Sequence, residues 1–513
     1  MLERHNRHLP LGARLTGEDE RAVSSKFLTQ RVLLSGDPGR LATATGQMML
    51  LVAANLIARF CPRIDVAVAG APGQDALGLL RRIDRSAYAE FRPVDHVDPN
   101  GYAAVLSIGS ARTGGPNVIA IDGVGWLALL SEVGDVSRPS HREDGNPFGA
   151  LMAVPLGVAE VFKRLLQPRE DKAAYFGDVT FSAFDYSVGA MAVGPRLPEA
   201  VQLPSALLAG VGAVGNAFLL ALSHVPGLRG ELTTVDRQHL DDPTNLNRYA
   251  LAFEEHIIPQ RPLPKVALAS RLFDGSDVCV RPLAEDLDQA LARIYGGELR
   301  RPEVVLSAVD NNSARETLQK LWPDLLLEGA TDETTSQVSR HDHAQGLACL
   351  MCIHSGPGAD TQPFSYGKTI AEASGFPEAR ISAALRDASA TVTDEDVRAA
   401  GPEKRDFLAQ RVGRPICSVL TEIEQLSVKP RGELPVRPAV SFVSMTSGTL
   451  LAAEYVKHAA GVGSPLETFF QMDLMFPLTS AFLQPVEKAK GCYCVQRSEE
   501  VARYRAAVEE SND

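Results

Sequence analysis

Three glycines at positions 210, 212 and 215 constrain this chain more than any other feature. They stand between a short apolar run, ALLA, and a helical pattern, AVGNAFLLALSHV. Between a strand and a helix, glycines at this spacing allow a tight turn, a close approach of the backbone to phosphate and close packing of helix on strand. Asp236 ends the next β-rich run, where a carboxylate can accept hydrogen bonds from ribose hydroxyls. The sequence therefore predicts a nucleotide site in an α/β fold, with a purely structural turn as the alternative.

The glycine turn belongs to a region, from about residue 205 to 323, in which β-rich and helical runs alternate. Four of the runs are almost continuously apolar, as buried parallel strands are. A weaker copy of this order lies upstream, and both copies lead into similar helices. Glu160 and Lys163 in the first helix correspond to Glu454 and Lys457 in the second. Two helices can look alike by chance, but the matching strand order favours duplication. The expected fold class is α/β, with two Rossmann-like doubly wound domains.

The two copies differ where chemistry would lie. The turn of the first copy, SGDPGRLATATG, lacks the glycine spacing, and its second strand ends in AVAGAP without an acidic residue. We therefore expect a degenerate, structural domain over residues 1–195 and a competent domain over 196–513. A polar, alanine-rich stretch predicts a helical insertion within the competent domain, over residues 356–437.

Composition excludes several classes of function. The formal net charge of −12 argues against a nonspecific nucleic-acid binder. No uncharged apolar run is long enough to span a bilayer, and Met48 to Ala58 is predicted to be a buried helix. The N-terminus has no apolar stretch typical of a secretory signal. Seven cysteines are few and odd in number, which favours a reducing, cytoplasmic compartment.

Charged residues downstream of the glycine turn distinguish between nucleotides. Arg248 and Lys265 follow Asp236, and Asp310 ends a later strand. Two cations suit phosphate charge that changes during a reaction, and an aspartate at a strand end can hold Mg²⁺. Taken singly, the cations could be surface charges and Asp310 a helix N-cap. Together they favour ATP with Mg²⁺ over NAD.

Four cysteines form two short pairs, Cys349 with Cys352 and Cys492 with Cys494. Zinc prefers four soft ligands in a tetrahedron, so the pairs predict a structural Zn²⁺ site. The alternative is a set of incidental buried thiols. His354 could replace one ligand, whereas His341 and His343 are expected at the surface.

The remaining cysteines divide into two kinds. Cys61 and Cys279 lie in apolar runs and are expected to be buried. Cys417 precedes a helical run and has Arg411 and Arg414 nearby, conditions that lower the pKa of a thiol. It is the candidate nucleophile, and the alternative is a cysteine packed at the start of a helix.

These motifs resemble the ubiquitin-activating enzymes and their bacterial relatives ThiF and MoeB. The resemblance covers Gly210 to about Gly461 well and the first half more faintly. The turn GVGAVGN is similar to the family's phosphate loop, and NLNR, from Asn245 to Arg248, to its N-L-x-R signature. Asp236 then falls on the ribose-binding acid, Lys265 on the phosphate-binding lysine and Asp310 on the magnesium aspartate. Tyr249 departs from the pattern, because glutamine is common there.

The resemblance implies an activity and further residues. The family adenylates the C-terminal glycine of a ubiquitin-like or sulfur-carrier protein. It takes an arginine from the N-terminus of the partner adenylation domain, and the segment RHNRHLPL places that role on Arg7. The degenerate half would be the inactive partner, fused to the active one as an intramolecular pseudo-dimer. Cys417 would take the carrier as a thioester and pass it to a conjugating enzyme.

The compact, alanine- and arginine-rich pattern resembles bacterial activating enzymes that serve their own ubiquitin-like proteins in antiviral operons. Three alternatives remain open at this point: activation of a sulfur carrier, a non-catalytic nucleotide-binding scaffold, and an NAD oxidoreductase. Whether two chains assemble into a homodimer is also open.

Overall fold

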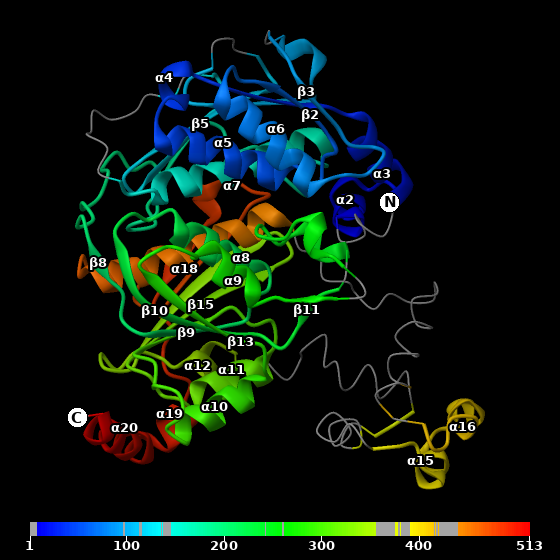
Figure 1. Cartoon of the computed structure of the whole chain (residues 1–513), viewed down its shortest axis with the longest axis vertical. Coiled ribbons are helices and arrows are strands. Elements are labelled where there is room, and N and C mark those ends of the chain that lie inside the picture. Colours follow the sequence, from blue (N-terminus) through cyan, green and yellow to red (C-terminus); the bar gives the residue numbers. More distant parts are fainter. Residues whose placement is uncertain are drawn as a thin grey trace. The chain divides into compact units, whose positions relative to one another are not determined.

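A computed structural model describes residues 8–95, 98–111, 115–134, 136, 145–241, 243–258, 261–354, 375–377, 380, 390–414, 416, 419 and 440–512 (Figure 1). The chain divides into two compact units. The first comprises residues 1–354 and 437–513, and the second comprises residues 355–436. The first unit contains two sheets, each of which combines parallel and antiparallel strands.

The first sheet follows the order β3-β2-β1-β4-β5-β6-β7. Strands β1 to β5 pair in parallel and are followed by antiparallel β6 and β7. The strands are β1 (Val32–Gly36), β2 (Arg63–Ala67), β3 (Glu90–Pro93), β4 (Ala104–Ile108), β5 (Val118–Val124), β6 (Leu127–Ser131) and β7 (Val179–Ser182). The helices are α2 (Leu9–Thr16), α3 (Glu20–Thr29), α4 (Pro38–Leu41), α5 (Ala44–Ile57), α6 (Ala71–Ile83) and α7 (Phe148–Leu166). Strands β4, β5 and β6 are buried along their whole length. Helices α5, α6 and α7 pack on the sheet and on one another, and a separate apolar cluster that includes Leu33, Val105 and Val118 joins β1, β4 and β5.

The second sheet follows the order β13-β10-β9-β14-β15-β16-β17-β18, with β8 added beside β10. Its strands are β8 (Val201–Gln202), β9 (Ala206–Ala209), β10 (Leu228–Val235), β13 (Val278–Leu283), β14 (Val304–Ser307), β15 (Leu325–Asp332), β16 (Thr335–Asp342), β17 (Phe469–Asp473) and β18 (Phe482–Gln484). A separate ribbon joins β11 (His239–Leu240) to β12 (Leu263–Pro264). The helices are α8 (Ala213–Ser223), α9 (Ala267–Leu272), α10 (Leu287–Tyr295), α11 (Asn312–Gln319), α12 (Leu350–His354), α18 (Ser441–Ala460), α19 (Tyr493–Gln496) and α20 (Ser498–Asn512).

The two sheets share one topology. The path β3-β2-β1-β4-β5-β6-β7 of the first matches β13-β10-β9-β14-β15-β16-β17 of the second, with parallel strands followed by antiparallel ones in both. Helix α5 follows β1 as α8 follows β9, and the long helix α7 precedes β7 as α18 precedes β17. The repeated order of elements predicted from the sequence is therefore present in space.

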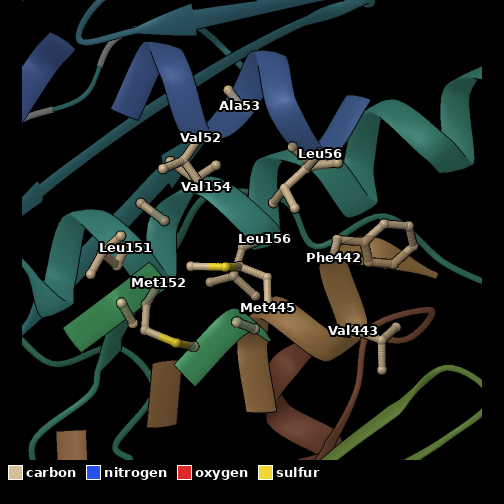
Figure 2. Close-up of a cluster of buried hydrophobic side chains, with 14 of the residues drawn as sticks. Val52, Ala53, Leu56, Leu151, Met152, Val154, Leu156, Phe442, Val443 and Met445 are labelled. Atoms are coloured by element: carbon tan, nitrogen blue, oxygen red, sulfur yellow. The ribbon is translucent and has the colours of Figure 1, made fainter. Parts of the chain in front are cut away.

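The long helices α7 and α18 pack against each other between the two sheets. Helix α7 also packs on β5 and β6, and α18 packs on β15 and β16, so one hydrophobic core runs through the unit (Figure 1). Figure 2 shows side chains of α5, α7 and α18 meeting in this core, among them Leu56, Val154 and Phe442. The interface between the two halves is thus a continuous apolar core.

Each long helix carries a buried ion pair at the same place. Lys163 pairs with Glu160 in α7 and Lys457 pairs with Glu454 in α18, and all four residues are buried. Lys163 Nζ also donates to Ala174 O at 2.7 Å, and Lys457 Nζ donates to a carbonyl outside its helix at 2.8 Å. Buried charges persist only when they are paired and hydrogen-bonded. In each half, the ion pair therefore joins the long helix to a backbone carbonyl of a neighbouring segment.

The second unit contains α15 (Asp394–Ala399) and α16 (Pro402–Ala409). Its small hydrophobic core includes Phe376, Val392 and Leu408. The Thr393 side chain caps α15, and Asp396 ion-pairs with Arg380 at 2.8 Å.

The structure corrects one expectation about the cysteines. Cys61 is buried, as predicted, but Cys279 is exposed. It lies on β13, the edge strand of the second sheet, and faces outward there. In the part of the chain that the structure describes, no helix has both the length and the apolar character that a membrane span requires.

Candidate nucleotide site and four-cysteine cluster

The carboxyl ends of three neighbouring parallel strands bring the predicted nucleotide residues to one edge of the second sheet. Strand β9 lies between β10 and β14. The glycine turn follows β9, Asp236 follows β10 and Asp310 lies three residues after β14. The chain leaves β9 toward β10 on one side, and β14 lies on the other. Such a topological switch point is where open α/β sheets bind ligands.

Each of the three glycines has its own steric reason. Gly210 has φ +89°, and a Cβ there would lie 2.6 Å from Ala308 O. A Cβ on Gly215 would lie 2.1 Å from Gly210 O, so this glycine lets α8 pack tightly on the turn. Around Gly212 the space is open, and the nearest side-chain atom to a Cβ there would be the Tyr249 hydroxyl at 3.9 Å. The turn therefore leaves backbone accessible at the N-terminus of α8, where phosphate is favoured.

Asp236 connects the end of β10 to this turn. Its Oδ2 accepts a hydrogen bond from Val211 N at 2.9 Å, and its Oδ1 accepts one from Gln238 N at 2.8 Å. A carboxylate has about four lone-pair positions, so two remain for ribose hydroxyls.

Arg248 and Lys265 both contact the ring of Tyr249. The Arg248 guanidinium lies 5.1 Å from the ring centroid, and Lys265 Nζ lies 4.9 Å from it. Lys265 Nζ also donates to the Tyr249 hydroxyl at 2.8 Å. Asn245 lies in the short helix η2 (Pro243–Asn247), and its carbonyl accepts from the amides of Arg248 and Tyr249. The two cations predicted from the sequence therefore lie together, and because Lys265 is buried it is not a surface charge.

Several polar atoms beside these cations have no partner within the described residues. Asn247 is completely buried, yet neither its Nδ2 nor its Oδ1 makes a hydrogen bond. The Nε of Arg248 is also buried without a partner. Buried donors without partners are costly and are a frequent sign of an absent ligand. The donor set of two cations, an amide and a helix N-terminus fits a phosphate-bearing nucleotide.

Asp310 is exposed, and its Oδ1 accepts a hydrogen bond only from the adjacent Asn311 side chain among the described residues. The N-cap of α11 is Asn311, whose side chain accepts from Ala314 N at 2.8 Å. The alternative of Asp310 as the helix N-cap is therefore wrong, and its carboxylate is available for a divalent cation, the ligand type that Mg²⁺ prefers.

Behind Asp310 lies a buried ion-pair network, in which Arg315 and Glu328 belong to no motif recognisable in the sequence. Glu328, on β15, accepts from Arg315 Nε at 2.6 Å and contacts His354 Nε2 at 2.7 Å. Arg315 Nη2 in turn donates to Val309 O at 3.2 Å, next to Asp310. Burial would raise the pKa of Glu328, but Arg315 and His354 outweigh it and lower the pKa to about 2. The network braces the loop that presents Asp310.

The corresponding edge of the first sheet is built differently. Val32 pairs with Ile64 and Ala104, as Ala206 pairs with Leu232 and Val304. Counted from these registers, Val68 occupies the position of Asp236, and Ser110 occupies the position of Asp310.

The first edge is also filled by its own side chains. Arg40 is buried and ion-pairs with Asp122 at 2.8 Å, and its Nη2 donates to Gly123 O at 2.8 Å. A Cβ on Gly36 would lie 2.8 Å from the Leu41 side chain. The first sheet therefore lacks both acids and the open turn of the second.

The four paired cysteines meet at α12 and α19. Sulfur–sulfur distances are 3.7 Å for Cys349–Cys352, 3.4 Å for Cys349–Cys492 and 3.4 Å for Cys352–Cys494. All four sulfurs lie within 4.8 Å of one another. These distances exceed a disulfide bond of about 2.05 Å. They approach the edge of about 3.8 Å of a tetrahedron with Zn–S bonds of about 2.3 Å. The donor set fits a structural zinc ion.

The neighbouring histidines are not ligands in this arrangement. His354 is bonded to Glu328 instead. His341 and His343 were expected at the surface, but His341 is fully buried and His343 is half-buried. The expectation for His341 failed because residues 340–342 of the polar run RHDH lie on the interior strand β16, where His341 Nδ1 contacts Ala348 O at 2.8 Å and Nε2 contacts Ser339 Oγ at 2.9 Å.

Two predicted residues, Arg7 and Cys417, lie outside the described residues. A hollow of about 520 Å³ opens elsewhere on the second sheet, beside Gln202, Gly230 and His458. Its lining comes from segments that lead into β9 and β14, from the start of β10 and from the end of α18, and includes none of the predicted site residues.

Comparison with protein families matches residues 187–494, more than half of the chain, to the ThiF family. The chain belongs to the ThiF family. It is thus an adenylyltransferase-like enzyme, in a family that performs ATP-dependent adenylation of ubiquitin-like or carrier proteins. Residues 31–183 of this ThiF-family protein match the BilD N-terminal domain, consistent with an activating enzyme of a Bil pathway.

Individual proteins that resemble this chain share at most 28% of their residues with it among those described here. The chain is 28% identical over 491 residues to y4jF of Sinorhizobium fredii (strain NBRC 101917 / NGR234), described as uncharacterized, covering 93% of this chain and 91% of that protein. A crystal structure of E. coli MccB with ATP is similar at 11% identity and a TM-score of 0.36, covering 74% of this chain and 97% of that one. Another, of MccB with MccA-N7isoASN, has 12% identity and a TM-score of 0.35, with coverage of 57% and 67%.

Proposed function

We propose that this protein activates the C-terminal carboxylate of a ubiquitin-like protein of a Bil-type antiviral pathway, with ATP as co-substrate and Mg²⁺ as cofactor. One observation carries the proposal: Arg248 and Lys265 meet at the Tyr249 ring above an open glycine turn, beside buried donors without partners. Two cations at one phosphate-accessible turn suit a reaction in which phosphate charge changes.

In the first step, an oxygen of the carrier's C-terminal glycine attacks the α-phosphorus of ATP. The bond between the α-phosphorus and the bridging oxygen breaks, and pyrophosphate leaves. Asp236 holds the ribose, Gly210, Gly212 and Gly215 admit the phosphates, and Arg248 and Lys265 stabilise the charge that develops. Asp310 would hold a magnesium ion, which would supply further neutralisation of the phosphate charge. Catalysis of this kind rests on position and electrostatics.

In the second step, the thiolate of Cys417 attacks the acyl carbon of the adenylate, and AMP leaves. The resulting thioester passes to the thiol of a conjugating enzyme. In this scheme residues 1–195 form the inactive adenylation domain, which contributes Arg7, and residues 196–513 form the active one. The segment 356–437 delivers Cys417, and a structural Zn²⁺ bound by Cys349, Cys352, Cys492 and Cys494 anchors the C-terminal part.

The decisive experiment is exchange of radiolabelled pyrophosphate into ATP with candidate ubiquitin-like proteins. We expect exchange that depends on the carrier and disappears when its C-terminal glycine is deleted. Lys265→Met should lower the exchange rate roughly 100-fold, as loss of one charge-stabilising donor commonly does. If none of the candidate ubiquitin-like proteins supports pyrophosphate exchange, the proposal is refuted.

The thioester step has a separate test. Carrier, ATP and enzyme should give a slower-migrating band that dithiothreitol removes, and Cys417→Ala should abolish it. Cys279→Ala is the matched control because Cys279 is an exposed cysteine remote from the proposed chemistry. A band that survives Cys417→Ala would transfer the role to another residue.

A further inference from the structure

Arg59 of the first half reaches into the second half. It follows α5 and is completely buried. Its Nη1 donates to Leu246 O and to Ala252 O, both at 2.8 Å, and its Nη2 donates to Ala250 O at 3.2 Å. Asn55, one turn earlier in α5, donates to the same Ala250 O at 2.9 Å and accepts from Arg59 Nε at 3.1 Å. One guanidinium thus spans three carbonyls of a single loop.

The loop held in this way, residues 246–252, carries Arg248 and Tyr249. The carbonyls that Arg59 binds lie on both sides of these two residues. A guanidinium is permanently charged, and its planar set of donors can satisfy several acceptors in fixed directions. Hydrogen bonds from a buried charge are strong, so they hold the loop firmly. Within the described residues the Arg248 guanidinium makes no hydrogen bond or ion pair and lies 5.1 Å from the centroid of the Tyr249 ring, so the loop backbone has a large part in determining where it lies.

A second attachment joins the same loop to the glycine turn. Asn216, immediately after Gly215, is fully buried, and its Oδ1 accepts from Leu251 N at 3.2 Å. Its Nδ2 donates to Val211 O at 2.8 Å and to Gly212 O at 2.9 Å. The loop is therefore fixed between Arg59 of the first half and the turn of the second.

We propose that Arg59 is a positioning residue for adenylation. It holds loop 246–252 so that Arg248 and Tyr249 lie over the glycine turn. The inference rests on the proposed function and extends it, because it gives the degenerate half a described residue that acts on the active site. A displacement of about 1 Å at a reacting centre can cost about 100-fold in rate, so loosening the loop should affect turnover.

The test compares Arg59→Lys and Arg59→Met with the wild-type chain. A lysine retains the charge but has one nitrogen, which cannot reach three carbonyls at once. We expect kcat for pyrophosphate exchange to fall 10- to 100-fold in both variants. The KM for ATP should change less than threefold, because the glycine turn and Asp236 remain in place. The lysine variant keeps the test valid if the methionine variant fails to fold.

Arg40→Met is the matched control. Arg40 is also a buried arginine of the first half, but its guanidinium pairs with Asp122 and Gly123 of that half. This variant should lose thermal stability and keep kcat within twofold of wild type. An equal loss of kcat in Arg40→Met would show that general destabilisation is responsible, and the positioning role would be overturned.

Hydrogen exchange measured by mass spectrometry tests the loop without reference to activity. The amides of Tyr249, Leu251 and Ala252 are hydrogen-bonded and should exchange slowly in the wild type. Their exchange should accelerate at least tenfold in the Arg59 variants, while β14 stays unchanged. If no carrier supports pyrophosphate exchange, the proposed function fails, but hydrogen exchange still tests whether Arg59 holds loop 246–252. Hydrogen exchange at the wild-type rate in the Arg59 variants would overturn the positioning role.

Discussion

The ammonium group of Lys265 donates a hydrogen bond of 2.8 Å to the hydroxyl of Tyr249. The hydroxyl also lies over Gly212, the open position of the turn. The centroid of the Tyr249 ring lies 4.9 Å from Lys265 Nζ and 5.1 Å from the Arg248 guanidinium, so one side chain is close to both cations of the candidate site.

Tyr249→Phe tests the contribution of this hydroxyl. The ring and its contacts with both cations remain, but the hydrogen bond to Lys265 is lost. A hydrogen bond to a charged group contributes about 1.5–3 kcal/mol, and Lys265 stabilises developing charge in the proposed step, so kcat for pyrophosphate exchange should fall roughly 10-fold or more. Tyr295→Phe is the control, because Tyr295 lies in α10 and its hydroxyl is bonded to Lys320 O at the end of α11. An unchanged kcat in Tyr249→Phe would exclude a role for the hydroxyl in holding Lys265.

Asp310→Asn tests the proposed cation site. The amide retains the shape of the side chain but loses its charge, so affinity for Mg²⁺ should fall. We expect the magnesium concentration for half-maximal exchange to rise at least 10-fold. Asp277→Asn removes the charge of another exposed aspartate, whose neighbour is Arg229, and should leave the magnesium dependence unaltered. An equal response of both variants would contradict a specific site at Asp310.

Cys349→Ser tests the four-cysteine cluster. Loss of one thiolate should reduce bound zinc from about one equivalent per chain to well below one and should lower the melting temperature. Zinc is measured with a colorimetric chelator after denaturation. Cys279→Ser changes an exposed cysteine and should keep both zinc content and melting temperature. A folded wild-type preparation without zinc would mean that the cluster is a set of reduced thiols.

The buried His341 predicts a dependence of stability on pH. Burial lowers the pKa of His341 from its ordinary value of 6.5 to about 4. Between these values the unfolded chain binds a proton that the folded chain does not. The folded state is therefore fully favoured above pH 6.5. The free energy of unfolding decreases as pH falls from 6.5 toward 4, by up to about 1.4 kcal/mol per pH unit.

Urea unfolding between pH 7 and pH 4 measures this effect. His341→Gln should reduce the slope of the unfolding free energy against pH by the equivalent of up to one bound proton, which is about 1.4 kcal/mol per pH unit. His343 is a matched comparison, because burial also lowers the pKa of His343 to about 4, and His343→Gln should reduce the slope similarly. A wild-type slope in both variants would contradict neutral buried imidazoles.

Much of the fold could be predicted because its signals are local. Strands β9 and β14 are short, mostly apolar runs, and the glycine spacing at Gly210 to Gly215 specified the turn between strand and helix. The repeated order of elements also indicated that one sheet topology occurs twice. These features depend on residues within a few positions of one another.

Contacts between distant segments could not be predicted in the same way. Arg59 ended an apolar helix and gave no sign that it would bind carbonyls near residue 250. His341 was expected outside because its neighbours are polar, yet β16 lies in the interior of the second sheet. Cys279 was expected inside because its run is apolar, yet β13 is an edge strand. The pairing of the strands decided the two cases of His341 and Cys279.

The apolar packing of α7 against α18 has a consequence for measurement. Two separate subunits that complete one another's site dissociate on dilution, so their specific activity falls with protein concentration. Here a covalent connection joins the two halves, and their interface is a shared core. Specific activity should therefore be independent of enzyme concentration down to the nanomolar range. Assembly of the two halves is therefore part of the folding of one chain and does not depend on protein concentration.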